Sequence, residues 1–219
     1  MAELLNIDCM EYMATLKDKA FELAIVDPPY GIGANGMTMG LNNGSILRSK
    51  QEWDENPPPD AYFAELRRVS KNYIVWGGNY FGQLWPCKCF LVWDKRQAKI
   101  PHRNMGDSEL AATSFDQVCR TFRYLWDGFQ KGTMDIGTQK IHPTMKPIQL
   151  YKWILTNYAS PGDRILDTHL GSGSSAIAAH QMGFDFVGCE IDKDYYDASV
   201  KRFNNAIMQQ SLFTPDQLK

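Results

Sequence analysis

Four consecutive residues, Asp27, Pro28, Pro29 and Tyr30, combine an acidic side chain, two rigid backbone positions and an aromatic ring. They directly follow the apolar run 23–26, which is typical of a buried strand. Both prolines fix φ and lack an N–H, so the turn is stiff and its carbonyl groups point in fixed directions. The Asp27 carboxylate and the Pro28 carbonyl can accept the two hydrogens of an exocyclic amino group, while Tyr30 offers a flat surface for a nucleobase. The residues indicate alkylation of an aromatic amine, although Asp and Pro also form ordinary turns.

A second segment has the pattern of a nucleoside-binding turn. A short apolar strand at 163–167 is followed by Gly171 and Gly173, and then by an alanine-rich stretch that is typical of a helix. Glycines in such a turn let the backbone approach a nucleoside at the helix N-terminus. Glu190 ends the next apolar run, where a carboxylate can accept both hydroxyls of a ribose. An NAD site uses similar residues, but hydride transfer has no use for the amine-binding turn, so the combination favours S-adenosyl-L-methionine.

The order of these motifs resembles the DNA amino-methyltransferases in the permuted arrangement called the beta class, in which the catalytic turn precedes the cofactor loop. The resemblance covers most of the chain, from 5–9 through 27–30 to the segment 141–147, I-H-P-T-M-K-P, and on to an expected helix at 195–202. H-P-T-x-K-P is the family's most distinctive companion to D-P-P-Y. The resemblance implies a DNA adenine-N6 methyltransferase acting on a flipped-out adenine, because cytosine-N4 enzymes of this class more often carry Ser in place of Asp27.

The resemblance also implies which residues bind S-adenosyl-L-methionine. Asp8 and Cys9 would flank its adenine, and Thr144 with Lys146 would contact its methionine carboxylate. The cofactor-binding residues expected on this basis are Asp8, Cys9, Asp27, His142, Thr144, Lys146, Asp167, His169, Gly171, Ser172, Gly173, Ser174, Glu190 and Ile191. The family usually has Pro-Phe after the loop aspartate, whereas this chain has Thr-His there. His169 therefore either replaces the aromatic wall of the cofactor site or shifts the cofactor.

Other functions share parts of this pattern. Cytosine-N4 methylation of DNA and amine methylation of RNA use the same chemistry, and a catalytically silent DNA-binding subunit would keep the same fold. A carbon-methylating enzyme would instead need a cysteine nucleophile, and Pro86-Cys87 has the sequence that such enzymes use. The D-P-P-Y turn, the motif order and the segment 142–147 favour nitrogen as the acceptor. We therefore expect Cys87 to be dispensable.

Length and composition favour one α/β domain. The chain has 219 residues, of which 44% are hydrophobic, enough for one substantial core. Strands are expected at 23–27, 72–76, 89–93, 109–114, 121–126, 164–167 and 184–189, and helices at 60–69, 147–158 and 192–208. This alternation predicts a largely parallel twisted sheet of the Rossmann-like, S-adenosylmethionine-dependent methyltransferase type, with an antiparallel hairpin at one edge. The strands that end at Asp27 and Asp167 are expected to be neighbours, which would bring donor and acceptor together.

Charge and cysteine content argue against several classes of protein. The formal net charge of −2 disfavours a globally basic nucleic-acid-binding protein. Five cysteines without paired C-x-x-C spacing argue against a disulfide framework and against a structural metal site. No apolar run has the length of a membrane span, and the first residues lack a signal-peptide pattern. We expect a cytoplasmic protein with no metal and no membrane partner.

Double-stranded DNA is the partner that the resemblance implies, and an adenine must leave the helix before Asp27 can contact its amino group. Positive charge is concentrated in a basic loop at about 94–107. A solvated loop face would carry the same charges, but the family places contacts to DNA in such segments. The residues expected to contact nucleic acid are Arg48, Lys50, Lys95, Arg96, Lys99 and Arg103.

The stretch 31–56 is rich in glycine and has no periodic pattern, which favours a mobile loop that closes over the flipped base, with plain disorder as the alternative. No segment has the length of a separate recognition domain, so the recognised DNA sequence is short, the specificity is relaxed, or recognition is shared with a second subunit in a homodimer.

The flexible tail at about 209–219 contains Gln209 to Phe213, Q-Q-S-L-F, which is similar to peptides that dock on the bacterial sliding clamp. Packing of this tail on its own domain is the alternative.

Overall fold

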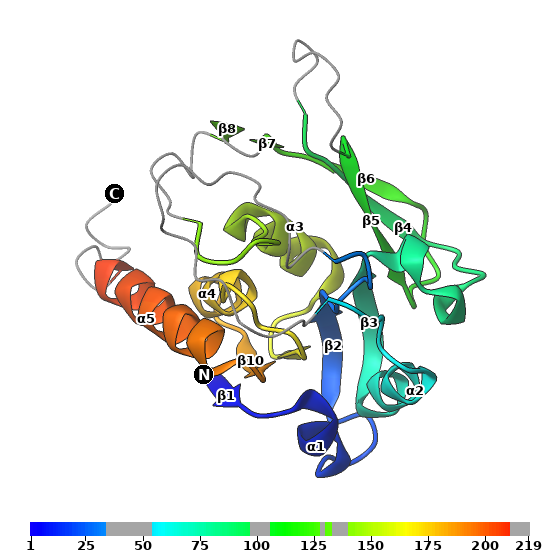
Figure 1. The fold of residues 1–219 in the computed structure, drawn as a ribbon, viewed down its shortest axis with the longest axis horizontal. Coiled ribbons are helices and arrows are strands. Elements are labelled where there is room, and N and C mark those ends of the chain that lie inside the picture. Colours follow the sequence, from blue (N-terminus) through cyan, green and yellow to red (C-terminus); the bar gives the residue numbers. More distant parts are fainter. Residues whose placement is uncertain (34–53, 97–105, 128–129, 133–139, 211–219) are drawn as a thin grey trace.

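An eight-stranded sheet runs through the centre of the molecule, in the order β1-β10-β9-β2-β3-β5-β4-β6 (Figure 1). The computed structural model describes residues 1–33, 54–96, 106–127, 130–132 and 140–210. The strands of this sheet are β1 (Ala2–Asn6), β2 (Phe21–Val26), β3 (Ser70–Trp76), β4 (Phe90–Asp94), β5 (Ser108–Thr113), β6 (Arg120–Arg123), β9 (Arg164–Asp167) and β10 (Asp185–Glu190). A separate pair of strands consists of β7 (Trp126–Asp127) and β8 (Gln130–Lys131).

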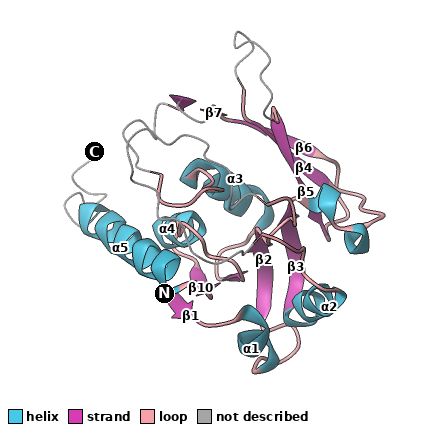
Figure 2. Ribbon diagram, in the orientation of Figure 1, coloured by secondary structure: helices cyan, strands magenta, loops and turns pink. Residues whose placement is uncertain are grey.

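Helices cover both faces of the sheet (Figure 2). They are α1 (Cys9–Ala14), α2 (Asp60–Val69), α3 (Ile148–Tyr158), α4 (Ser174–Gln181) and α5 (Lys193–Gln210), and two short 3-10 helices after β3, η2 (Gly78–Tyr80) and η3 (Gly82–Leu84). Residues of α1 and α2 contribute to one hydrophobic layer, and residues of α3, α4 and α5 contribute to the other. The sheet is therefore sandwiched between two layers of helices, as a largely parallel sheet requires.

Successive side chains of β2 point into the two hydrophobic layers in turn, as the two-residue repeat of a strand requires. Leu23 and Ile25 pack in the layer of α3 and α4, whereas Ala24 and Val26 pack in the layer of α2. All four side chains are buried. Burial on both faces explains why the sequence shows a continuous apolar run here instead of an alternating one.

The carboxyl ends of β1, β10, β9, β2 and β3 lie at one edge of the sheet, because these five strands are parallel. β2 and β9 are direct neighbours, with Leu23 opposite Ile165, as predicted. From β9 the chain passes through α4 to β10 on one side, whereas β2 precedes α2 and β3 on the other. The strand order reverses between β2 and β9, which is where doubly wound sheets bind their ligands.

The antiparallel part of the sheet differs in detail from the prediction. β4 and β5 form the expected antiparallel pair, but β5 lies between β3 and β4, and the edge strand β6 runs parallel to β4. The strand expected at 121–126 ends at Arg123, and Trp126 is buried at the start of β7. β1 and α1 were not predicted. Short strands without strict alternation carry little information on their pairing, which explains these errors.

Parts of the predicted loops and tail belong to regular elements. Asp94 ends β4 instead of beginning the basic loop, and Gln209 and Gln210 end α5 instead of beginning the tail. Residues 34–53 of the predicted mobile loop, 97–105 of the basic loop and 211–219 of the tail lie outside the described residues. Within the described part of the chain, no helix has both the length and the apolar character needed to cross a membrane.

Tyr62 joins α2 to the turn after β9, because its hydroxyl lies 2.6 Å from the hydroxyl of Thr168 and both residues are buried. Tyr62→Phe should lower the free energy of unfolding by about 1–2 kcal/mol, since the Thr168 hydroxyl loses a partner. Tyr158→Phe is the matched control, because the buried Tyr158 hydroxyl has no hydrogen-bond partner among the described residues. Its effect should stay under about 0.5 kcal/mol. Urea denaturation measures both values, and equal losses would contradict a stabilising role for the Tyr62 hydroxyl.

Candidate active site

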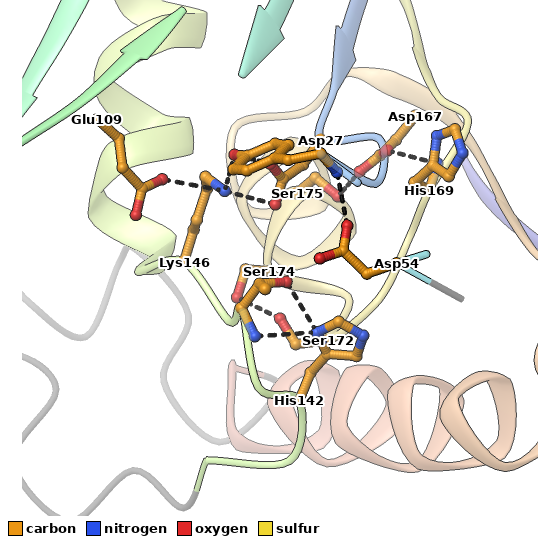
Figure 3. A network of polar contacts seen from close by, with 12 residues as sticks. Asp27, Asp54, Glu109, His142, Lys146, Asp167, His169, Ser172, Ser174 and Ser175 are labelled. Carbon is orange, nitrogen blue, oxygen red and sulfur yellow. Dashed lines mark hydrogen bonds and ion pairs between the residues drawn. The ribbon is translucent and has the colours of Figure 1, made fainter. Parts of the chain in front are cut away.

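The turn after β2 carries Asp27, whose two carboxylate oxygens are both engaged (Figure 3). The Tyr30 hydroxyl donates to Oδ1 at 2.6 Å, and the Lys146 ammonium forms an ion pair with Oδ2. Burial raises the pKa of Asp27, and the positive charge of Lys146 limits that rise. Asp27 is thus an oriented hydrogen-bond acceptor at the carboxyl end of a central strand.

Tyr30 is held by residues that were not predicted from the sequence. Asp54 accepts hydrogen bonds from the backbone N–H groups of Tyr30 at 2.6 Å and of Gly31 at 3.0 Å. The Tyr30 ring lies against Gly77, which has a φ of 70°, and a Cβ at Gly77 would lie 2.2 Å from the ring. Tyr80 stacks on the same ring with 5.0 Å between centroids. Only glycine at position 77 leaves room for this ring.

The segment from β9 to α4 forms the strand, glycine turn and helix that the sequence predicts. Asp167 accepts hydrogen bonds from the His169 backbone N–H at 3.0 Å and from the Ser175 hydroxyl at 2.5 Å. Burial raises the pKa of Asp167 to about 7. Gly173 caps the start of α4 with a φ of 71°, a conformation that favours glycine. Asp167 therefore stabilises the turn from inside the fold.

Glu190, the last residue of β10, is held by two backbone groups. Its Oε2 accepts from the N–H of Gly171 at 2.8 Å, and its Oε1 accepts from the N–H of Asp192 at 3.0 Å. Burial raises the pKa of Glu190, and these two hydrogen bonds oppose the rise. Each carboxylate oxygen has a second lone pair, so Glu190 can accept further hydrogens from a ligand.

A cavity of about 300 Å³ opens between these turns. The predicted site residues that line it are Asp27, Pro29, His142, Thr144, Lys146, His169, Gly171, Ser172, Glu190 and Ile191. Further lining residues, which were not predicted, are Met145, Tyr151, Leu170, Asp192 and Tyr195. The sequence held a signal for three of these residues, because Met145, Leu170 and Asp192 directly adjoin predicted site residues. Tyr151 lies on α3 and had no such signal.

The other residues predicted for catalysis or cofactor binding do not line this cavity: Asp8, Cys9, Pro28, Tyr30, Asp167, Gly173 and Ser174. Asp8 caps α1 by accepting a hydrogen bond from the Met10 N–H at 2.6 Å, and Cys9 is the first residue of that helix. Ser174 accepts a hydrogen bond from Arg202 at 2.9 Å. The roles expected for Asp8 and Cys9 at a cofactor adenine stay predictions.

The H-P-T-M-K-P segment brings His142, Thr144 and Lys146 to the cavity. The Thr144 N–H donates to His142 Nδ1 at 3.3 Å, so this nitrogen is an acceptor and the ring is neutral. Burial, together with the charge of Lys146, lowers the pKa of His142 to about 3. Lys146 also lies 3.3 Å from Glu109 of β5 (Figure 3). The expected contact of Lys146 with a methionine carboxylate stays a prediction.

Two of the predicted nucleic-acid contacts lie among the described residues. Lys95 pairs with Glu109 at 3.0 Å and Arg96 pairs with Asp107, and the two basic side chains are 19% and 18% exposed. Neighbouring acids therefore balance these charges. The remaining predicted contacts lie outside the described residues: Arg48, Lys50, Lys99 and Arg103.

Known proteins are similar to this chain over most of its length. The family model N6_N4_Mtase, described as DNA methylase, matches residues 76–201. The type II methyltransferase M2.MboI of Moraxella bovis is 24% identical, over 90% of this chain and 85% of that protein. A crystal structure of an M1.HpyAVI–SAM complex has a TM-score of 0.60 at 21% identity, covering 92% of this chain and 100% of that chain. The cytosine-N4-specific PvuII DNA methyltransferase has a TM-score of 0.60 at 11% identity, covering 95% and 92%. These likenesses confirm the predicted fold.

His142 makes the stability of the fold depend on pH. Its pKa falls from an ordinary value of 6.5 to about 3 on folding, so the unfolded state binds more protons between these values. The stabilisation from the neutral ring is complete above pH 6.5 and is lost as the pH falls toward 3. His142→Gln should flatten the acid decline of the unfolding free energy by up to about 1.4 kcal/mol per pH unit. Urea denaturation at several pH values measures both slopes, and parallel slopes would show that His142 is not the source.

Proposed function

The chain belongs to the DNA methylase family, and we propose that it transfers a methyl group from S-adenosyl-L-methionine to N6 of an adenine in DNA. One observation carries this proposal. Asp27 of the D-P-P-Y turn and Glu190, the last residue of β10, line the same cavity. An acceptor for amine hydrogens and an acceptor for ribose hydroxyls thus face one space, because their strands end at the same edge of the sheet.

The residues of the cavity fit S-adenosyl-L-methionine. Glu190 is oriented by two backbone groups and keeps acceptor capacity for a ribose. Leu170 and Ile191 provide apolar contact for an adenine. His169, which stands where the family usually has an aromatic residue, lines the cavity as a neutral ring because burial lowers its pKa to about 4. When bound, S-adenosyl-L-methionine supplies an electrophilic methyl group.

Asp27 and the Pro28 carbonyl act on the acceptor amine. An exocyclic amine is a poor nucleophile, because its lone pair is delocalised into the ring. Acceptance of its two hydrogens by these oxygens favours a pyramidal nitrogen whose lone pair is available for attack. The hydrogen bond from Tyr30 fixes the orientation of the carboxylate, and such positioning supports the reaction. The base must leave the duplex to reach this turn.

Cytosine-N4 methylation is the second candidate function. The exocyclic amine of cytosine also has two hydrogens to donate, and a cytosine-N4-specific enzyme shares the fold. Adenine is preferred because the turn begins with Asp27, whereas the cytosine enzymes of the class that the sequence resembles more often begin it with Ser. The methylated nucleoside itself distinguishes the two functions.

Methyl transfer to nitrogen predicts that Asp27 is needed and that Cys87 is not. The purified protein, incubated with unmethylated DNA and methyl-labelled S-adenosyl-L-methionine, should give labelled N6-methyladenine after digestion to nucleosides. Asp27→Ala should lower turnover by about 100-fold or more, because the amine loses its acceptor. Cys87→Ala should leave turnover unchanged, since the Cys87 thiol donates to the Cys89 carbonyl at 2.9 Å and does not line the cavity.

Two other results would redirect the conclusion. Labelled N4-methylcytosine would favour the second candidate function. Loss of transfer in Cys87→Ala, with transfer retained in Asp27→Ala, would rule out nitrogen as the acceptor and point to covalent chemistry at carbon.

The cofactor site is tested separately by binding. In Glu190→Gln, the amide keeps one acceptor oxygen but places an NH2 group against a backbone N–H, so contact with a ribose is weakened. Affinity for the unreactive cofactor analogue sinefungin, measured by calorimetry, should fall about 10–100-fold. Glu65→Gln is the matched control, because Glu65 pairs with Arg68 on α2. Equal affinity in the wild type and both variants would remove Glu190 from the site.

A further inference from the structure

The ammonium of Lys146 is buried among three acceptors. Its side chain is 3% exposed, and Nζ contacts Asp27 Oδ2, the Tyr30 hydroxyl at 3.4 Å and Glu109 Oε2 at 3.3 Å. Burial alone would lower the pKa of Lys146, but the two carboxylates outweigh burial and raise it. An ammonium has three N–H donors, so each of them can face one of these acceptors.

Methyl transfer, as proposed above, creates a conflict at Asp27. Its Oδ1 accepts from Tyr30 and its Oδ2 is paired with Lys146, so the carboxylate is already engaged. If the Lys146 ammonium stays on Oδ2, its positive charge weakens Asp27 as a hydrogen-bond acceptor for the amine. An ammonium that leaves needs another counter-ion, because an unpaired charge is costly in buried surroundings.

Glu109 has the position and the charge to be that counter-ion. It lies on β5, on the side of Lys146 away from Asp27, and it does not line the cavity (Figure 3). Its Oε1 accepts from Lys95 at 3.0 Å, whereas its buried Oε2 faces the Lys146 ammonium at the longer distance of 3.3 Å. Burial works to raise the pKa of Glu109, but Lys146 and Lys95 outweigh it and lower the pKa. The group is therefore ionised beside Lys146.

We propose that Glu109 is a positioning residue that takes over the Lys146 ammonium when an amine binds Asp27. This role rests on the function proposed above, and it belongs to a residue outside both the motifs and the cavity. Lys146 reaches the new position by closing the 3.3 Å gap to Oε2. The buried charges stay balanced, so Asp27 becomes free to accept without leaving a lone ammonium.

Glu109→Gln tests this role, because it keeps the shape of the side chain and removes its charge. An amide cannot neutralise an ammonium, so Lys146 would stay on Asp27. We expect kcat for DNA methylation to fall about 10–100-fold, while KM for DNA stays within about twofold of the wild-type value. Affinity for sinefungin should not change, since Glu109 lies outside the cavity. Glu65→Gln, which alters a carboxylate in a different ion pair, should keep the wild-type kcat and KM.

Glu109→Asp distinguishes a charge effect from a packing effect. It restores the negative charge on a shorter side chain, so kcat should recover to within about threefold of the wild type at unchanged KM. A wild-type kcat in Glu109→Gln would overturn the role, and so would a loss that appears in KM or in sinefungin affinity instead of kcat. If Glu109→Gln is too unstable to assay, a kcat in Glu109→Asp as low as that of Asp27→Ala would also overturn it. Failure of the proposed function would look different, because the wild-type protein would then transfer no label to DNA.

Discussion

The ion pair between Asp27 and Lys146 is the interaction on which the rest of the site depends. It joins the end of β2 to a residue 119 positions later, and the two side chains are only 13% and 3% exposed. Neither charge would be stable alone in this place, because an unpaired buried charge carries a large desolvation cost. The pair therefore holds the H-P-T-M-K-P segment over the carboxyl end of β2, and with it the His142 and Thr144 side chains that line the cavity.

The central part of the fold could be predicted because its strands are buried on both faces. The apolar runs at 23–26 and 164–167 are local signals, and the adjacency of β2 and β9 followed from the rule for doubly wound sheets. The pairing of β4, β5 and β6 could not be predicted in the same way. It depends on which edge is available after the central strands have paired, and that information is not contained in the local alternation of side chains.

Some residues of the candidate site could also be predicted from the sequence, and others could not. The positions of Asp27 and Glu190 at the cavity were predictable, because Asp27 directly follows an apolar strand and Glu190 ends one. Asp54, Gly77 and Glu109 were not, because each acts by holding another residue. Asp54 lies 24 positions from the Tyr30 N–H that it accepts from, and Gly77 matters only because the Tyr30 ring lies against it. Such partners are set by tertiary contacts, and no spacing in the sequence reports them.

Three carboxylates at the ends of neighbouring strands differ in their hydrogen-bond and ion-pair partners. Asp167 of β9 accepts from a hydroxyl and a backbone N–H, its pKa rises to about 7, and it holds a turn together. Glu190 of β10 accepts from two backbone N–H groups, which orient it while leaving acceptor capacity toward the cavity. Asp27 after β2 has an ammonium as its partner. Backbone groups cannot move away when a ligand arrives, but a lysine side chain can. Of the three, Asp27 is therefore the carboxylate whose acceptor strength can change during a reaction, provided that a second carboxylate receives the lysine.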